Sequence, residues 1–120
     1  NIDIYARQYN LSGGVYTPID ELVVSAETNG FQYAQNITTL EGGSHVITWV
    51  SDAQDDSSRS VYAQKFNVNG AKDGDEFKVN TDSNNARGDT NVSALEDGGF
   101  IITWTGEGPG DSEGVYAQRY

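Results

Sequence analysis

Residues 96–120 read EDGGFIITWTGEGPGDSEGVYAQRY, and residues 41–66 carry a close copy of them, EGGSHVITWVSDAQDDSSRSVYAQKF. The final phrase recurs once more as IYARQY at residues 4–9. Trp49 and Trp104 lie 55 residues apart, and other matched positions keep nearly the same spacing. A period of this length is typical of propeller blades and solenoid repeats. The chain therefore contains two repeats, and its first residues correspond to the middle of a repeat unit.

Each repeat contains four short segments with strand character, separated by Gly, Asp, Asn and Ser. The segment at residues 100–105 is apolar on both faces, which predicts a strand that is buried on both sides. The expected strands are residues 61–66, 76–80, 91–95 and 100–105 in the second repeat, and 4–9, 22–25, 37–40 and 46–50 in the first. We divide the single domain into repeats at about residues 4–60 and 61–114, followed by a terminal strand at residues 115–120.

Four-stranded antiparallel units joined by loops predict an all-β, propeller-like fold of two blades plus one surplus strand. Two blades cannot close a ring, because propellers need about 4 to 8 of them. We therefore expect either self-association, with a trimer closing a six-bladed ring, or a piece of a longer array. A β-sandwich built from the same strands is the alternative fold.

The composition narrows the class of partner and of chemistry. The chain has 18 acidic and 7 basic residues, a net charge of -11, which predicts no nucleic-acid partner because phosphate is repelled. No apolar run approaches the ~20 residues of a membrane span. With no cysteine and one histidine, His45, common nucleophile–base pairs and zinc sites are largely excluded. We expect a non-catalytic protein, with a polysaccharide hydrolase that uses paired carboxylates as one alternative.

The phrase GGF-IITW, the Gly/Asp/Ser-rich loop after it and the phrase VYAQRY resemble a tandem repeat of large secreted bacterial proteins. These are the calcium-dependent adhesins and hemolysin-type (RTX-like) surface proteins. The resemblance covers residues 44–120 well and residues 1–43 more loosely, with His45 in the place of Phe100. It implies a bacterial, secreted or surface-exposed, propeller-like binding or spacer module.

Acidic side chains gather between the Trp strand and the Tyr strand of each repeat. Ca²⁺ takes 6–8 oxygen ligands, and clustered carboxylates in a loop supply them. We therefore predict calcium as a cofactor of these loops; a solvated turn that protects a strand edge is the alternative. Neither loop has the EF-hand pattern. The predicted ligands are Asp52, Asp55, Asp56, Asp111 and Glu113.

Each repeat also supplies a Trp, a Tyr and a Gln close together. Sugars stack on aromatic faces and bond to flanking amides, and repeated weak sites gain avidity. We therefore predict a carbohydrate-binding, lectin-like adhesion module whose partner is a glycan or cell-surface polysaccharide. The alternatives are blade-packing roles for the two tryptophans and a structural spacer function. The predicted ligand-binding residues are Trp49, Tyr62, Gln64, Trp104, Tyr116 and Gln118.

Overall fold

The computed structural model describes residues 1–52, 54, 59–81, 86–108 and 110–120. Within these residues there are eleven β-strands and one 3₁₀ turn, η1 (Glu41–Gly43), which confirms the all-β class. No helix in the described part is long and apolar enough to cross a membrane. The strands are β1 (Tyr5–Ala6), β2 (Tyr9–Ser12), β3 (Val15–Pro18), β4 (Leu22–Val23), β5 (Gln32–Thr39), β6 (His45–Asp52), β7 (Arg59–Phe66), β8 (Phe77–Lys78), β9 (Ala86–Ala94), β10 (Phe100–Gly108) and β11 (Asp111–Arg119).

Strands that follow one another in the chain are neighbours in three of the four antiparallel sheets, and the fourth pairs β1 with β4. β5, β6, β7 and β8 form a four-stranded sheet, and β9, β10 and β11 form a three-stranded sheet. The two repeats use the same register, since Trp49 lies opposite Tyr62 and Trp104 lies opposite Tyr116. β1 and β4 form a two-stranded ribbon that matches β7 and β8 of the complete sheet.

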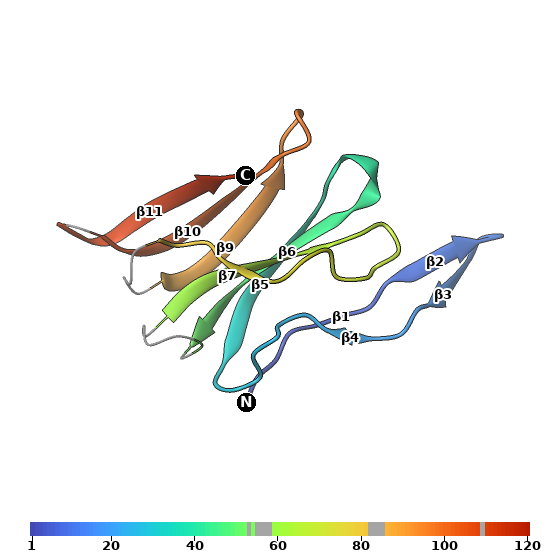
Figure 1. The fold of residues 1–120 in the computed structure, drawn as a ribbon, viewed down its shortest axis with the longest axis horizontal. Helices are drawn as coiled ribbons and strands as arrows, with labels where there is room; N and C mark the ends of the chain where they lie inside the picture. Colours follow the sequence, from blue (N-terminus) through green and yellow to red (C-terminus); the bar gives the residue numbers. More distant parts are fainter. Residues whose placement is uncertain (53, 55–58, 82–85, 109) are drawn as a thin grey trace.

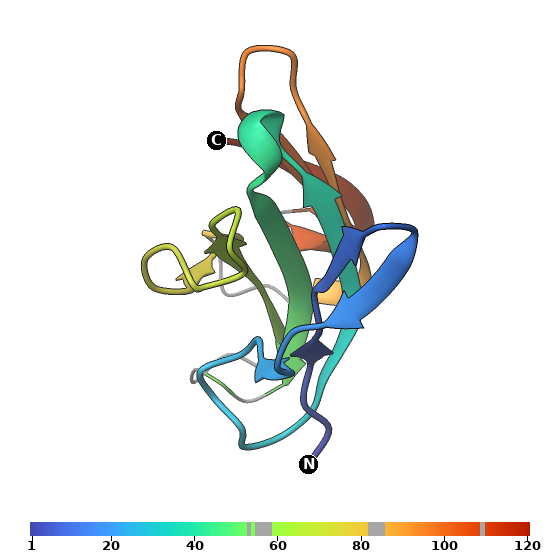
Figure 2. The same cartoon turned by 90° about the vertical axis from the view of Figure 1, so that its right-hand side faces the viewer.

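The sheets lie in three layers, with the four-stranded sheet in the middle (Figure 1). The β9–β11 sheet covers one of its faces and the β1–β4 ribbon covers the other, as the view in Figure 2 also shows. Each junction encloses its own apolar core. The core against β9–β11 contains Leu40, Val46, Val50, Val61, Ala63, Val79, Ala86, Val92, Phe100 and Ile102; the core against the ribbon contains Ile4, Val24, Ile47, Trp49, Tyr62 and Phe66.

The two Trp strands differ in how far they are covered. In β6, every residue from Val46 to Ser51 is buried, so the prediction of burial on both faces is confirmed for that strand. In β10, Phe100 and Ile102 are buried, while Ile101 on the opposite face is only half-buried. The reason is the layering, because no described element covers the outer face of β10. Burial of β10 on both sides was therefore wrong for this chain.

The prediction of one strand over residues 4–9 is also wrong. Here β1 ends at Ala6 and a separate hairpin, β2–β3, begins at Tyr9. The hairpin turns at Gly13 and Gly14, whose φ values of 58° and 78° suit the two-residue turns that join antiparallel strands. The hairpin extends away from the three layers (Figure 1).

Two equivalent strands, β5 and β9, each carry a bulge that sequence patterns did not reveal. Ala34 in β5 and Asp89 in β9 are equivalent positions, and both have positive φ, 53° and 54°. The pairing with β6 and with β10 shifts at these points. A left-handed non-glycine residue costs about 1–2 kcal/mol, so its presence at the same place twice marks the bulge as part of the repeat.

Candidate functional site

The candidate site is the Trp–Tyr pair that each repeat places across its two central strands. The ring centroids of Trp49 and Tyr62 are 6.2 Å apart with an interplanar angle of 21°. Those of Trp104 and Tyr116 are 6.1 Å apart, also at 21°. Directly opposed residues of antiparallel strands hold their side chains in contact, so the shared register produces the same stack twice.

In the middle sheet (β5–β8) this pair is part of the core. Trp49 is fully buried and Tyr62 is buried with it, beneath Ile4 and Val24 of the ribbon layer. Gln64 is buried as well, and its Nε2 donates to the backbone oxygens of Lys65 at 2.9 Å and Gly74 at 3.0 Å. The three predicted ligand residues of this sheet are therefore brought together, but they are closed to a ligand and stabilise the sheet.

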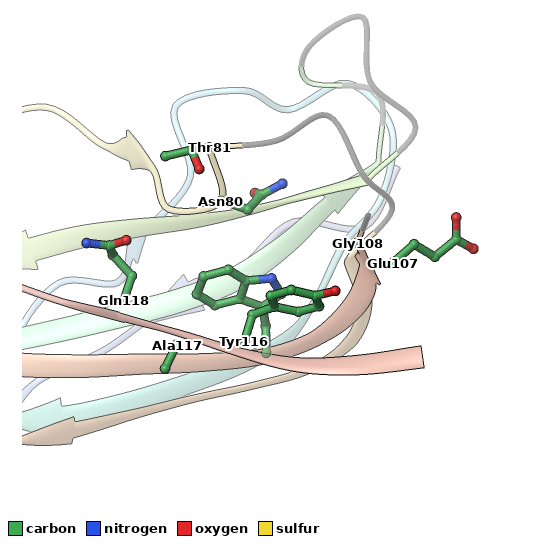
Figure 3. Close-up of a pocket in the computed structure, with 8 residues that line it drawn as sticks. Asn80, Thr81, Glu107, Gly108, Tyr116, Ala117 and Gln118 are labelled. Atoms are coloured by element: carbon green, nitrogen blue, oxygen red, sulfur yellow. The ribbon is translucent and has the colours of Figure 1, made fainter. Parts of the chain in front are cut away.

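In the β9–β11 sheet the equivalent residues, Trp104, Tyr116 and Gln118, line an open cavity of about 150 Å³. Trp104 and Tyr116 are half-buried and Gln118 is exposed. Asn80, Thr81, Glu107, Gly108 and Ala117 complete the lining, and Figure 3 shows the Glu107 carboxylate directed away from the Tyr116 ring. Pockets for small molecules usually measure ~300–1,000 Å³, so this cavity suits the edge of one ring rather than a whole ligand.

Glycines fix the position of the Tyr116 ring. A Cβ on Gly114 would lie 2.8 Å from the Tyr116 hydroxyl oxygen, closer than real Cβ atoms approach. Gly108, which also lines the cavity, faces the same ring. The ring therefore depends on two positions without side chains, for which the sequence pattern gave no signal.

The predicted calcium ligands do not converge in the described part of the chain. Asp52 Oδ1 accepts from Arg59 Nε at 3.1 Å, and Asp111 Oδ1 accepts from the backbone N–H of Glu113 at 3.0 Å. Asp55 and Asp56 lie outside the described residues. No group of three or more His, Cys, Asp or Glu residues within those ranges could hold a metal ion. Calcium binding by these loops therefore stays a prediction.

The pKa of Tyr33 is shifted, partly by the ion pair between Asp52 and Arg59. Partial burial raises the pKa of Tyr33, and the neighbouring Asp52 carboxylate raises it further, against a lowering by Arg59. His45, the only histidine, is half-buried, and its Nδ1 lies 3.1 Å from Thr39 Oγ1. These contacts join neighbouring strands of the middle sheet.

The structure also contains openings that the sequence did not indicate. Two cavities of about 430 and 220 Å³ lie on the ribbon side of the middle sheet. Both are lined by Ala6, Arg7, Ile37 and Ile47. They lie where the β1–β4 ribbon covers the middle sheet incompletely, and the order of the layers is not visible in the sequence.

Comparison of the chain with protein families, with curated proteins and with solved structures finds no match.

Proposed function

We propose that this chain is a non-catalytic, propeller-like repeat module whose main function is structural, as a spacer in a large secreted or cell-surface bacterial protein. The observation that carries the proposal is the Trp–Tyr pair. Its geometry is the same in both repeats, 6.2 and 6.1 Å at 21°, and both tryptophans lie on the sheet face that packs against the preceding unit. A residue pair that recurs for packing stabilises the fold rather than binding a ligand.

The layering supports the propeller-like arrangement. In each repeat, the sheet face that carries the tryptophan packs against the preceding unit, so that successive units stack in one direction. The middle sheet is a complete antiparallel four-stranded unit, and propellers are built from such units packed face to face. Stability of such arrays is the sum of each unit and its contacts with its neighbours. The secreted or surface location rests on the family resemblance alone.

Carbohydrate binding is the second candidate, and the open cavity at Trp104 favours it. A half-buried Trp–Tyr stack beside the amides of Asn80 and Gln118 offers an apolar face with polar partners. We expect any glycan bound there to be lost with Trp104→Ala and retained with Trp49→Phe. A glycan array run with and without Ca²⁺ tests this function, and retention of no glycan would exclude it for the conditions used.

A fused tandem chain tests the structural proposal. Residues 115–120 are equivalent to residues 4–9, so residues 1–120 joined directly to a second copy of residues 10–120 continue the repeat without a surplus strand. We expect one cooperative unfolding transition at a higher temperature than that of the single chain, because new layer contacts form. Two halves that each melt at the temperature of the single chain would contradict the proposal.

A further inference from the structure

The last strand exposes a residue that is buried at both equivalent positions. Val115 precedes the tyrosine of β11 as Ile4 and Val61 precede theirs. Its exposed fraction is 78%, against 6% for Ile4 and 0% for Val61. In the middle sheet, Val61 packs on the β9–β11 sheet that follows it in the chain. The outer face of β9–β11 is therefore an uncovered copy of a face that the same chain covers one repeat earlier.

The opposite end of the layers has a complementary deficiency. Ile37 in β5 is 59% exposed, whereas its equivalent in β9, Val92, is 4% exposed. Val92 is buried by the middle sheet, but Ile37 faces the two-stranded ribbon, which lacks counterparts of β5 and β6. The cavities of about 430 and 220 Å³ lie beside Ile37, where those two strands would pack.

The strand edges match as well. In the complete repeat, β7 pairs with β8, Tyr62 lying opposite Lys78. The ribbon repeats this pairing with Tyr5 opposite Val23. Among the described residues, β11 pairs with β10 on one edge and with no strand on the other. Its equivalent tyrosine, Tyr116, thus lacks the partner strand that the other two tyrosine strands have.

We propose that copies of this chain associate head to tail by strand exchange, with β11 of one copy taking the place of β1 in the next. Val115 then fills the buried position of Ile4, and Ala117 lies opposite Leu22 of the second copy. The β9 and β10 strands of the first copy, carried in with β11, cover Ile37 of the second. This proposal rests on the propeller-like function above, because it continues the same stacking between chains.

The similar sequences of the two strands favour the exchange, and the negative charge of each copy opposes it. IYARQY and VYAQRY share the alternation that their sites require, and β1 is held to β4 by only two residue pairs. The chain's own β1 competes at a high effective concentration, so association depends on protein concentration. Each copy carries a net charge of -11, and salt screens the repulsion between copies. Association is therefore expected to strengthen with ionic strength.

Cysteine cross-linking tests the register, because the chain contains no cysteine. Ala117→Cys in one chain and Leu22→Cys in a second, mass-tagged chain are mixed and oxidised. The proposal predicts a disulfide-linked heterodimer, because opposed residues meet the 4.4–6.8 Å Cα separation that disulfides require. Val115→Cys is the control, since it lies two residues, or about 7 Å, out of register with Leu22. Equal yields from both mixtures, or no heterodimer, overturn the proposal.

Light scattering over a range of protein concentrations supplies a test that does not depend on residue 22. We expect wild-type chains to form oligomers, and Val115→Asp to weaken association at least about tenfold by placing a charge in a buried site. Leu11→Asp, at a similarly exposed position on the β2–β3 hairpin, should associate as the wild type does. A monomeric wild type, or equal effects of the two variants, overturns the proposal. If the fused tandem chain is cooperative but separate chains stay monomeric, only this inference fails.

Discussion

Replacing each tryptophan by alanine compares two identical side chains in different surroundings. Trp49 is fully buried between the middle sheet and the ribbon, whereas Trp104 is half-buried beside an open cavity. Truncation of a buried Trp costs about 3–5 kcal/mol, including the cavity that it leaves. Trp104→Ala should cost about half as much, because part of its indole already contacts water. Trp49→Ala therefore removes a large share of the ~5–15 kcal/mol that stabilises an ordinary domain.

The assay is urea unfolding at equilibrium, followed by far-ultraviolet circular dichroism because both variants lose a fluorophore. The free energy of unfolding should fall in the order wild type, Trp104→Ala, Trp49→Ala. Conservative Trp→Phe variants at the same positions keep both proteins folded if an alanine variant does not fold, and they should give the same order. Equal losses at the two positions, or a greater loss at Trp104, would refute the difference in burial between the two tryptophans.

Three further predictions follow from individual contacts. Gly114→Ala should displace the Tyr116 ring and change its near-ultraviolet circular dichroism signal. Gly110→Ala has open space around its Cβ and should leave that signal unchanged, although its φ of 79° means that the alanine strains the backbone. The Gly99 N–H, and after it Arg119, hold the pKa of Asp97 below its usual value, so this carboxylate stabilises the fold above the ordinary Asp pKa and less as pH falls through the lowered value. Asp97→Asn should therefore flatten the acid limb of a stability–pH curve. Removal of Ca²⁺ with a chelator should leave the melting temperature unchanged, because both cores are apolar; a large drop would revive the calcium prediction for the loop at residues 52–58.

Much of the fold could be predicted from the sequence because the repeat shows each pattern twice. The strand alternation in residues 61–66, the Asp97-Gly98-Gly99 turn and the apolar run at residues 46–50 all lie where strands and turns are found. These features depend on local periodicity and turn chemistry, which sequence carries directly. The all-β class follows from them.

What could not be predicted depends on which element lies over a residue. Trp49 and Trp104 share the local sequence Ile-Thr-Trp and both face the preceding unit, yet only Trp49 is fully buried, in a sheet of four strands, whereas the sheet of Trp104 has three. Likewise, the pattern of residues 4–9 reads as one strand, but the hairpin that starts at Tyr9 ends the pairing with β4. Tertiary cover of this kind leaves no trace in a single repeat.

The bulges illustrate the same limit at one residue. Asp adopts positive φ more readily than Ala, yet both residue types occur at this position. The side chains of Ala34 and Asp89 therefore do not indicate the shift in pairing. The bulge is stabilised through contacts with the other repeat, where Thr90 Oγ1 donates to the Ala34 oxygen at 2.7 Å. Carbohydrate binding at Trp104 and calcium binding in the acidic loops stay predictions.

Quenching of tryptophan fluorescence by acrylamide tests the central claim, that the repeated Trp–Tyr pair is sealed within the middle sheet but borders an open cavity in the β9–β11 sheet. The chain has two tryptophans, so Trp104→Phe leaves Trp49 and Trp49→Phe leaves Trp104 as the only indole. The account predicts blue-shifted emission and almost no quenching for Trp49, with red-shifted emission and clear quenching for Trp104 at low protein concentration. Equal quenching of the two, or stronger quenching of Trp49, would contradict this difference in burial.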